Sequence, residues 1–196
     1  SAGPAFGLTL RSARPSSARS ISTTTPRRRW IPPFATGWLH GDKRRPEKTF
    51  KQLNADNLAH AYLINAIGPS LLVKHLVPKL ATDRAAHVGI LSARVGSISD
   101  NRLGGWHAYR ASKAALNMLI KNFALEWSRN RLPHVIVGLQ PGTTDTALSA
   151  PFQRGVPEGH LQTPAYTADQ LCRVMQHLRE EDSGLLFDFL GLPFEP

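Results

Sequence analysis

The chain has 196 residues, a length that suits one domain with a sizeable apolar core rather than two independent domains. Its hydrophobic fraction of 41% is ordinary for a globular protein, and no apolar run approaches the roughly 18 residues that a membrane span requires. The single cysteine, Cys172, excludes an internal disulfide and a multi-cysteine zinc site.

The formal net charge of +10 is unevenly distributed along the chain. Residues 1–41 contain no Asp or Glu, and this part is rich in Arg, Ser and Thr, as mitochondrial transit peptides are. We expect residues 1–33 to be a basic, disordered leader, with or without a targeting role, and residues 34–196 to be the folded domain, located in the cytoplasm or the mitochondrion. The cluster Arg27–Arg29 lacks interleaved aromatic residues, so no nucleic-acid partner is expected.

Six segments show the residue patterns of regular secondary structure. In chain order they are a helix from near Asp56, a strand in HVGIL, a helix from Trp106 to Ser128, a strand in HVIVGLQ, a further helix, and a strand around GLLFDF. Thr167 and Gln170 have the spacing of a capping box at the start of the last helix.

Strands that alternate with helices of this length predict an α/β fold, a Rossmann-like three-layer doubly wound parallel sheet with helices on both faces. In such sheets ligands bind beyond the carboxyl ends of the strands. The loops after Ala93 and after Gln140 both follow predicted strands. We therefore expect the functional site at that edge of the sheet.

Tyr109 and Lys113 are four residues apart in HAYRASKAALNML, so both side chains project from one face of the predicted helix. A phenol with a pKa of about 10 is a weak acid-base catalyst at neutral pH, and a nearby ammonium lowers that pKa toward the working range. The pair is a candidate for general acid-base chemistry. The alternative is a solvated helix face, because this spacing also arises by chance.

The string YRASKAALN, preceded by a strand that ends in serine and by a loop containing Gly-Ser, resembles the active site of the short-chain dehydrogenase/reductase family. Three further segments agree in order and spacing: INAIGP, GSISDNRLGGW, which is similar to the loop of C-factor and sniffer-type carbonyl reductases, and PGTTDT, which matches the family's cofactor motif. ATGWLH, from Ala35 to His40, is similar to the family's Asn-Asn-Ala-Gly turn, with Phe34 where an Asn is usual.

The resemblance implies an NAD(P)-dependent oxidoreductase of the carbonyl reductase or alcohol dehydrogenase type, which transfers hydride between NAD or NADP and a small carbonyl or alcohol substrate. It implies proton donation by Tyr109 beside the cofactor. It implies that Lys113 binds the nicotinamide ribose and lowers the tyrosine pKa, and that Asn65 shapes its helix and holds a proton-relay water. Four residues of the PGTTDT segment would also meet the cofactor: Pro141, Gly142, Thr144 and Thr146.

Two departures from the family pattern bear on activity. Counted back from Gly96, the family's catalytic serine falls on Ala93, which leaves Ser92 as the candidate substitute one position earlier. Because one oxyanion donor is worth about 2.7–4 kcal/mol in other enzymes, this change predicts a slow enzyme rather than an inactive one.

The second departure concerns the glycine-rich turn with which the family's chains open and which holds cofactor phosphate at a helix N-terminus. Gly3 and Gly7 have part of its spacing, but Thr9 occupies the third position, so we interpret these glycines as coincidental and the fold as incomplete at the N-terminus. The alternative function is a catalytically silent binding or interaction protein with the same fold. The choice between NAD and NADP stays open.

Partners follow from the resemblance and from the residue patterns. In the family the helices that correspond to those starting near Asp56 and Trp106 form subunit interfaces, which implies a homodimer or homotetramer. The eight histidines lack the HExxH spacing that places metal ligands on one helix face, so no metal is expected. No membrane partner is expected either.

Overall fold

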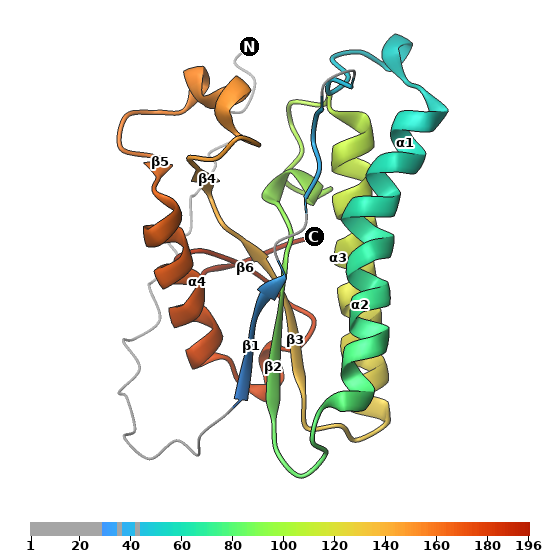
Figure 1. Ribbon diagram of the computed structural model, residues 1–196, viewed down its shortest axis with the longest axis vertical. Coiled ribbons are helices and arrows are strands. Elements are labelled where there is room, and N and C mark those ends of the chain that lie inside the picture. Colours follow the sequence, from blue (N-terminus) through green and yellow to red (C-terminus); the bar gives the residue numbers. More distant parts are fainter. Residues whose placement is uncertain (1–28, 35–36, 42–43) are drawn as a thin grey trace, which may run out of the picture.

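The computed structural model describes residues 37–41 and 44–196 in full and the backbone of residues 29–34. The described residues form three layers, with a central sheet between α1, α2 and α3 on one face and α4 on the other (Figure 1). The helices are α1 (Ala55–Tyr62), α2 (Gly68–Leu76), α3 (His107–Arg129) and α4 (Pro164–His177).

The main sheet has the strand order β1-β2-β3-β6-β7, in which the first four strands are parallel and β7 is antiparallel. Its strands are β1 (Arg29–Phe34), β2 (Ala86–Leu91), β3 (Val135–Gln140), β6 (Leu186–Asp188) and β7 (Pro193–Phe194). Two short parallel strands, β4 (Thr143–Thr144) and β5 (Leu161–Gln162), pair separately beyond the end of β3.

The strands β2 and β3 are buried on both faces, and successive residues contribute to different cores. Val88, Ile90 and Ile136 pack against α3. The alternate residues Val135, Val137 and Leu139 pack with Met175 and its neighbours on α4. Two apolar cores therefore hold the helices to opposite faces of the sheet, which confirms the predicted three-layer α/β class.

The predicted helices and strands agree with the structure, apart from one helix start. Thr167 is not the cap of α4, because the hydroxyl of Thr163 accepts the Tyr166 N–H and Pro164 occupies the first turn. Proline fits that position, since its missing N–H would have no helical partner there. Thr167 is instead buried within the helix.

The strand β1 begins at Arg29, inside the range 1–33 that the sequence assigned to a leader. It pairs with β2 through the register Arg29↔Ala86 to Ile31↔Val88, so the folded part includes residues before position 34. The remainder of the expected leader, residues 1–28, lies outside the described residues. None of the described helices is long and apolar enough to cross a membrane.

Candidate active site

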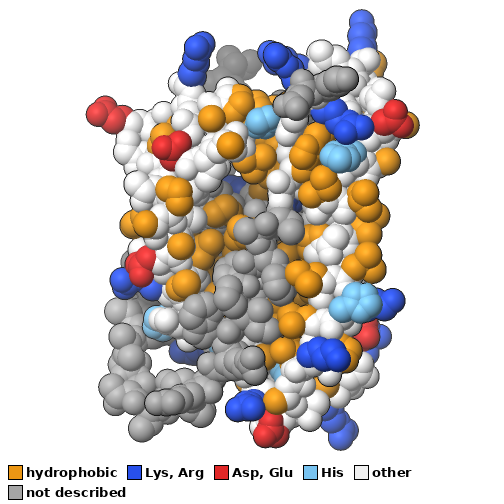
Figure 2. Space-filling model, viewed as in Figure 1, with side chains coloured by type: hydrophobic (Ala, Val, Ile, Leu, Met, Phe, Trp, Pro, Cys, Tyr) orange, Lys and Arg blue, Asp and Glu red, His pale blue; other side chains and the backbone are white. Residues whose placement is uncertain are grey.

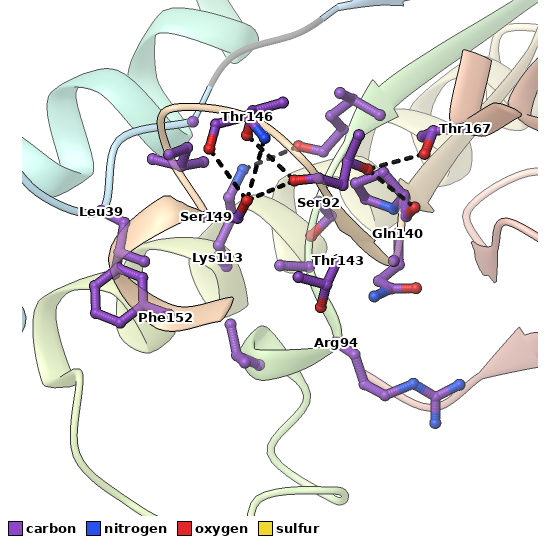
Figure 3. Close-up of a pocket in the computed structure, with 18 of the residues that line it drawn as sticks. Leu39, Ser92, Arg94, Lys113, Gln140, Thr143, Thr146, Ser149, Phe152 and Thr167 are labelled. Carbon is purple, nitrogen blue, oxygen red and sulfur yellow. Dashed lines mark hydrogen bonds between the residues drawn. The ribbon is translucent and has the colours of Figure 1, made fainter. Parts of the chain in front are cut away.

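A cavity of about 920 Å³ lies at the carboxyl ends of β2 and β3. This is the edge at which parallel sheets bind ligands, and the volume is within the range of ligand pockets, roughly 300–1,000 Å³. Its walls come from the loops after β2 and β3, the start of α3, the segment Ala150–Gly155 and the first half of α4. Leu39 and Phe152 lie on one side of it and Gln140 and Thr167 on the other (Figure 3).

Tyr109 and Lys113 both line this cavity from the first two turns of α3. The Lys113 side chain is 1% exposed, and its Nζ donates a hydrogen bond to the Leu91 carbonyl at the end of β2, at 3.0 Å. The same Nζ lies 6.0 Å from the centre of the Tyr109 ring. The structure therefore places the pair in the wall of a cavity and not on a solvated helix face.

Burial shifts the pKa values of both groups toward their neutral forms. It raises the pKa of Tyr109 to about 12 and lowers the pKa of Lys113 to about 8. The raised tyrosine pKa is opposite to the direction that the family resemblance implied. The cause is desolvation of the phenolate by burial.

These pKa values predict how stability depends on pH. Between about pH 8 and 10.5 the unfolded chain keeps the Lys113 proton that the folded chain has released. The free energy of unfolding should therefore rise with pH in this range, by about 1 kcal/mol per pH unit. Between pH 10 and about 12 the folded chain keeps the Tyr109 proton that the unfolded chain has lost, so stability should fall.

Urea unfolding of the wild type and Lys113→Met at pH 7.5 and pH 9.5 measures the first effect. The wild type should gain stability relative to Lys113→Met as the pH rises. Parallel changes in the two proteins would show that Lys113 titrates at its ordinary pKa.

Ser92, the candidate substitute for the family's serine, is 4% exposed and its hydroxyl donates to Asn117 Oδ1 on α3. Ser92 and Ala93 both belong to the cavity lining, but Ala93 has no hydroxyl and that of Ser92 is engaged by Asn117. Asn117 Oδ1 is thus the acceptor for the Ser92 hydroxyl, whereas the Asn117 amide nitrogen is buried and has no hydrogen-bond partner among the described residues. The structure thus offers no free hydroxyl at position 92 or 93.

Asn65 is fully buried in a π-helical turn, Leu63–Ile67, between α1 and α2. Its Oδ1 accepts the Trp38 N–H at 2.7 Å, and its Nδ2 donates to the Trp38 carbonyl and the Ser112 hydroxyl at 2.9 Å each. Asn65 is not part of the cavity lining. It joins the loop after β1 to α3, and π-turns of this kind are frequent near functional sites.

All four residues expected from the PGTTDT segment line the cavity: Pro141, Gly142, Thr144 and Thr146. Gly142 has φ 75°, a left-handed conformation that strains other residues, so this turn favours glycine. The Thr144 hydroxyl is 2.9 Å from that of Thr167, which ties the turn to α4.

The donors at the cavity fit the nicotinamide end of a dinucleotide. They combine an ammonium, a phenol and threonine hydroxyls beside a glycine turn that allows close approach of the backbone. Gly37, in the loop after β1, also lines the cavity, and a Cβ there would lie 4.0 Å from Lys113 Nζ.

Several residues at the site were not assigned a role from the sequence, although Trp106 ends the segment GSISDNRLGGW. Trp106 and Phe152 line the cavity with ring centres 4.9 Å apart. Arg94 extends away from the other labelled residues (Figure 3), and its guanidinium lies 3.0 Å from Asp100 and 3.7 Å from Asp188. Arg94 thereby links the loop after β2 to the end of β6.

Side chains that could bind a metal are dispersed in the part of the chain that the structure describes. No group of three or more His, Cys, Asp or Glu residues in that part could hold a metal ion.

Comparison with known sequences identifies the family. The chain is 33% identical to the C-signal of Myxococcus xanthus over 135 residues, which cover 69% of this chain and 76% of that protein. It is 35% identical over 132 residues to 1-hydroxy-2-glutathionyl-2-methyl-3-butene dehydrogenase of Rhodococcus sp. strain AD45, covering 67% of this chain and 55% of the relative.

Solved structures show the same fold. The NADPH-bound carbonyl reductase from chicken fatty liver matches with a TM-score of 0.69 at 24% identity, and the carbonyl reductase Sniffer of D. melanogaster with 0.68 at 22% identity. Each match covers 82% of this chain and 63% of the other, so the chain spans less than two thirds of these structures. The sequence profile described as short chain dehydrogenase matches residues 41–156, and the chain belongs to the short-chain dehydrogenase/reductase family.

Proposed function

We propose that this chain acts as an NAD(P)-dependent reductase of small carbonyl compounds, with Tyr109 as the proton donor. The observation that carries the proposal is the placement of Tyr109 and Lys113, one helical turn apart, in the wall of a cavity at the carboxyl ends of β2 and β3. The structural neighbour from chicken fatty liver was solved with NADPH, which supports a nicotinamide cofactor.

The bound cofactor would supply the hydride, and this chain's residues would bind, orient and protonate. Lys113 and the turn Pro141–Thr144 would hold the nicotinamide end of the cofactor. Tyr109 would give its proton to the carbonyl oxygen as that oxygen gains negative charge. Asn65 would act through the backbone of Trp38 and the Ser112 hydroxyl, which it bonds, by keeping α3 in place.

The protonation state of Tyr109 favours reduction over oxidation. With a pKa raised to about 12 by burial, the phenol is protonated at neutral pH. Carbonyl reduction needs a phenol that can donate, whereas alcohol oxidation needs a phenolate that can accept. The reductive direction therefore uses the form that is already present.

The substrate end of the cavity is apolar. Leu39, Leu148, Phe152, Val156 and Trp106 all contribute to its lining. Such a wall recognises the carbon skeleton of a substrate by burial rather than by hydrogen bonds. The proposed substrates are therefore small carbonyl compounds with apolar substituents.

We infer that two or more copies of the chain associate through α1, α2 and α3. Leu63, Ile67 and Leu71 follow one another at four-residue spacing and are 56%, 44% and 49% exposed, and Met118 on α3 is 62% exposed. Apolar side chains are visible over this edge of the molecule (Figure 2). For a homodimer or homotetramer, the molar mass in solution, measured by light scattering, should be two or four times the 21.5 kDa chain mass, and a mass equal to one chain would contradict the inference.

Cofactor binding tests the proposed function. The full chain is titrated with NADH and with NADPH, and binding is followed by fluorescence. We expect dissociation constants above the low-micromolar range, because the contacts proposed among the described residues involve the nicotinamide end of the cofactor alone. Lys113→Met should weaken binding further. Equal affinity of the variant and the wild type, or no binding by either, would count against the proposal.

A further inference from the structure

Glu47 is a buried acidic residue outside the cavity lining. Only 3% of its surface is exposed, although it lies in the loop between β1 and α1. Among residues 37–41 and 44–196, no Lys or Arg lies within ion-pair distance of it. Burial of a carboxylate is costly unless hydrogen bonds or a compensating charge offset it, so the position of Glu47 needs a physical reason.

The N-terminus of α3 supplies that compensation. Glu47 Oε2 accepts the Ala108 N–H at 3.2 Å, and the Glu47 carbonyl accepts the Trp106 N–H. The first N–H groups of a helix have no partner within it, and the helix dipole favours negative charge at that end. Glu47 therefore caps α3 from a position 61 residues earlier in the chain.

The turn that Glu47 holds has an unusual backbone. Gly104, Gly105 and Trp106 follow one another in the left-handed region, with φ of 63°, 65° and 49°. Glycine adopts this conformation readily, but a tryptophan does so only when its surroundings enforce it. A Cβ at Gly105 would lie 3.4 Å from the Glu47 carbonyl, so the two segments are in close contact at this point.

The strained turn places two side chains that line the cavity. The ring of Trp106 lies 6.5 Å from that of Tyr109 and 4.9 Å from that of Phe152, measured between ring centres. We propose that Glu47 is a positioning residue, which fixes Trp106 and Tyr109 against the cavity by capping the start of α3. Its kinetic consequence rests on the function proposed above, but its structural consequence does not.

The structural consequence can be measured without activity. The full chain is labelled with 3-fluorotyrosine, and the ¹⁹F resonance of Tyr109 is assigned with Tyr109→Phe. Glu47→Ala should broaden or shift this resonance. It should also increase the difference between the chemical shifts of this resonance in H2O and in D2O at pH 7, because Tyr109 gains access to water. Glu47→Gln keeps an acceptor oxygen and should preserve the wild-type resonance.

A matched control separates positioning from general loss of stability. Ile120→Val removes one methylene from the core beneath α3, away from the cavity, and should lower the melting temperature while leaving the Tyr109 resonance unchanged. If Glu47→Ala does not fold, Glu47→Asp replaces it, since that variant keeps the charge but withdraws the carboxylate from Ala108.

Kinetics give the second measurement. Glu47→Ala should lower kcat by roughly 10- to 100-fold with KM nearly unchanged, and Glu47→Gln should restore most of the rate. A Tyr109 resonance in Glu47→Ala or Glu47→Asp that matches the Ile120→Val control would overturn the inference. If the wild type reduces no carbonyl compound, the proposed function fails, and the fluorine spectra still decide whether Glu47 positions Tyr109.

Discussion

Replacing Tyr109 with phenylalanine is expected to lower kcat for carbonyl reduction by roughly 10²–10⁴-fold or to abolish it. The change removes the hydroxyl that would donate the proton and keeps the ring that packs against Trp106. Cofactor affinity and melting temperature should therefore change little. Steady-state kinetics, fluorescence titration and thermal unfolding of the same preparation measure the three quantities.

Tyr166→Phe is the matched control for this substitution. Tyr166 is 45% exposed on α4 and does not line the cavity, so loss of its hydroxyl should leave kcat unchanged. Near-normal turnover by Tyr109→Phe would show that the chemistry arises elsewhere. The catalytically silent interaction protein would then be the better description of this chain.

Introducing a serine at position 93 is expected to raise kcat by up to roughly 10²–10³-fold. Ala93 lines the cavity with an extended backbone, φ −155° and ψ 142°, at the position where the family resemblance places the catalytic serine. One hydrogen bond to the developing oxyanion is worth about 2.7–4 kcal/mol in other enzymes, which corresponds to that gain. KM should change little, because the bond strengthens in the transition state.

Ser92→Ala separates this effect from the existing serine. Because the Ser92 hydroxyl is bonded to Asn117 inside the protein, its loss should reduce stability by about 1 kcal/mol and leave kcat of the folded protein nearly unchanged. A large fall in kcat for Ser92→Ala, together with no gain for Ala93→Ser, would show instead that Ser92 is the oxyanion donor.

The architecture could be predicted because its signals are local. Apolar runs bounded by loops identify β2 and β3, and helical periodicity without an internal Gly or Pro identifies α3. The four-residue spacing of Tyr109 and Lys113 needs only a helix to bring them onto one face. The same local reasoning placed the cap of α4 at Thr167, because the competing pair Thr163 and Pro164 lies just before the apolar pattern begins.

The remaining features of the site depend on contacts between distant segments. Glu47 and Ala108 are 61 residues apart, and Ser92 and Asn117 are 25 apart, so no motif or periodicity could reveal either contact. The direction of the Tyr109 pKa shift follows from burial, which sequence spacing does not determine. The spacing of Tyr109 and Lys113 alone therefore could not predict the direction of this pKa shift.

Direct detection of hydride transfer tests the proposed function most directly. The full chain is incubated with a small apolar ketone and with NADPH or NADH carrying deuterium at C4 of the nicotinamide ring, in each of its two diastereomers, at millimolar concentration. Mass spectrometry of the alcohol should show deuterium from one diastereomer, and Tyr109→Phe should prevent its appearance. An alcohol without deuterium from either diastereomer, or no alcohol at all from the wild type, would contradict the proposal that this cavity reduces carbonyl compounds.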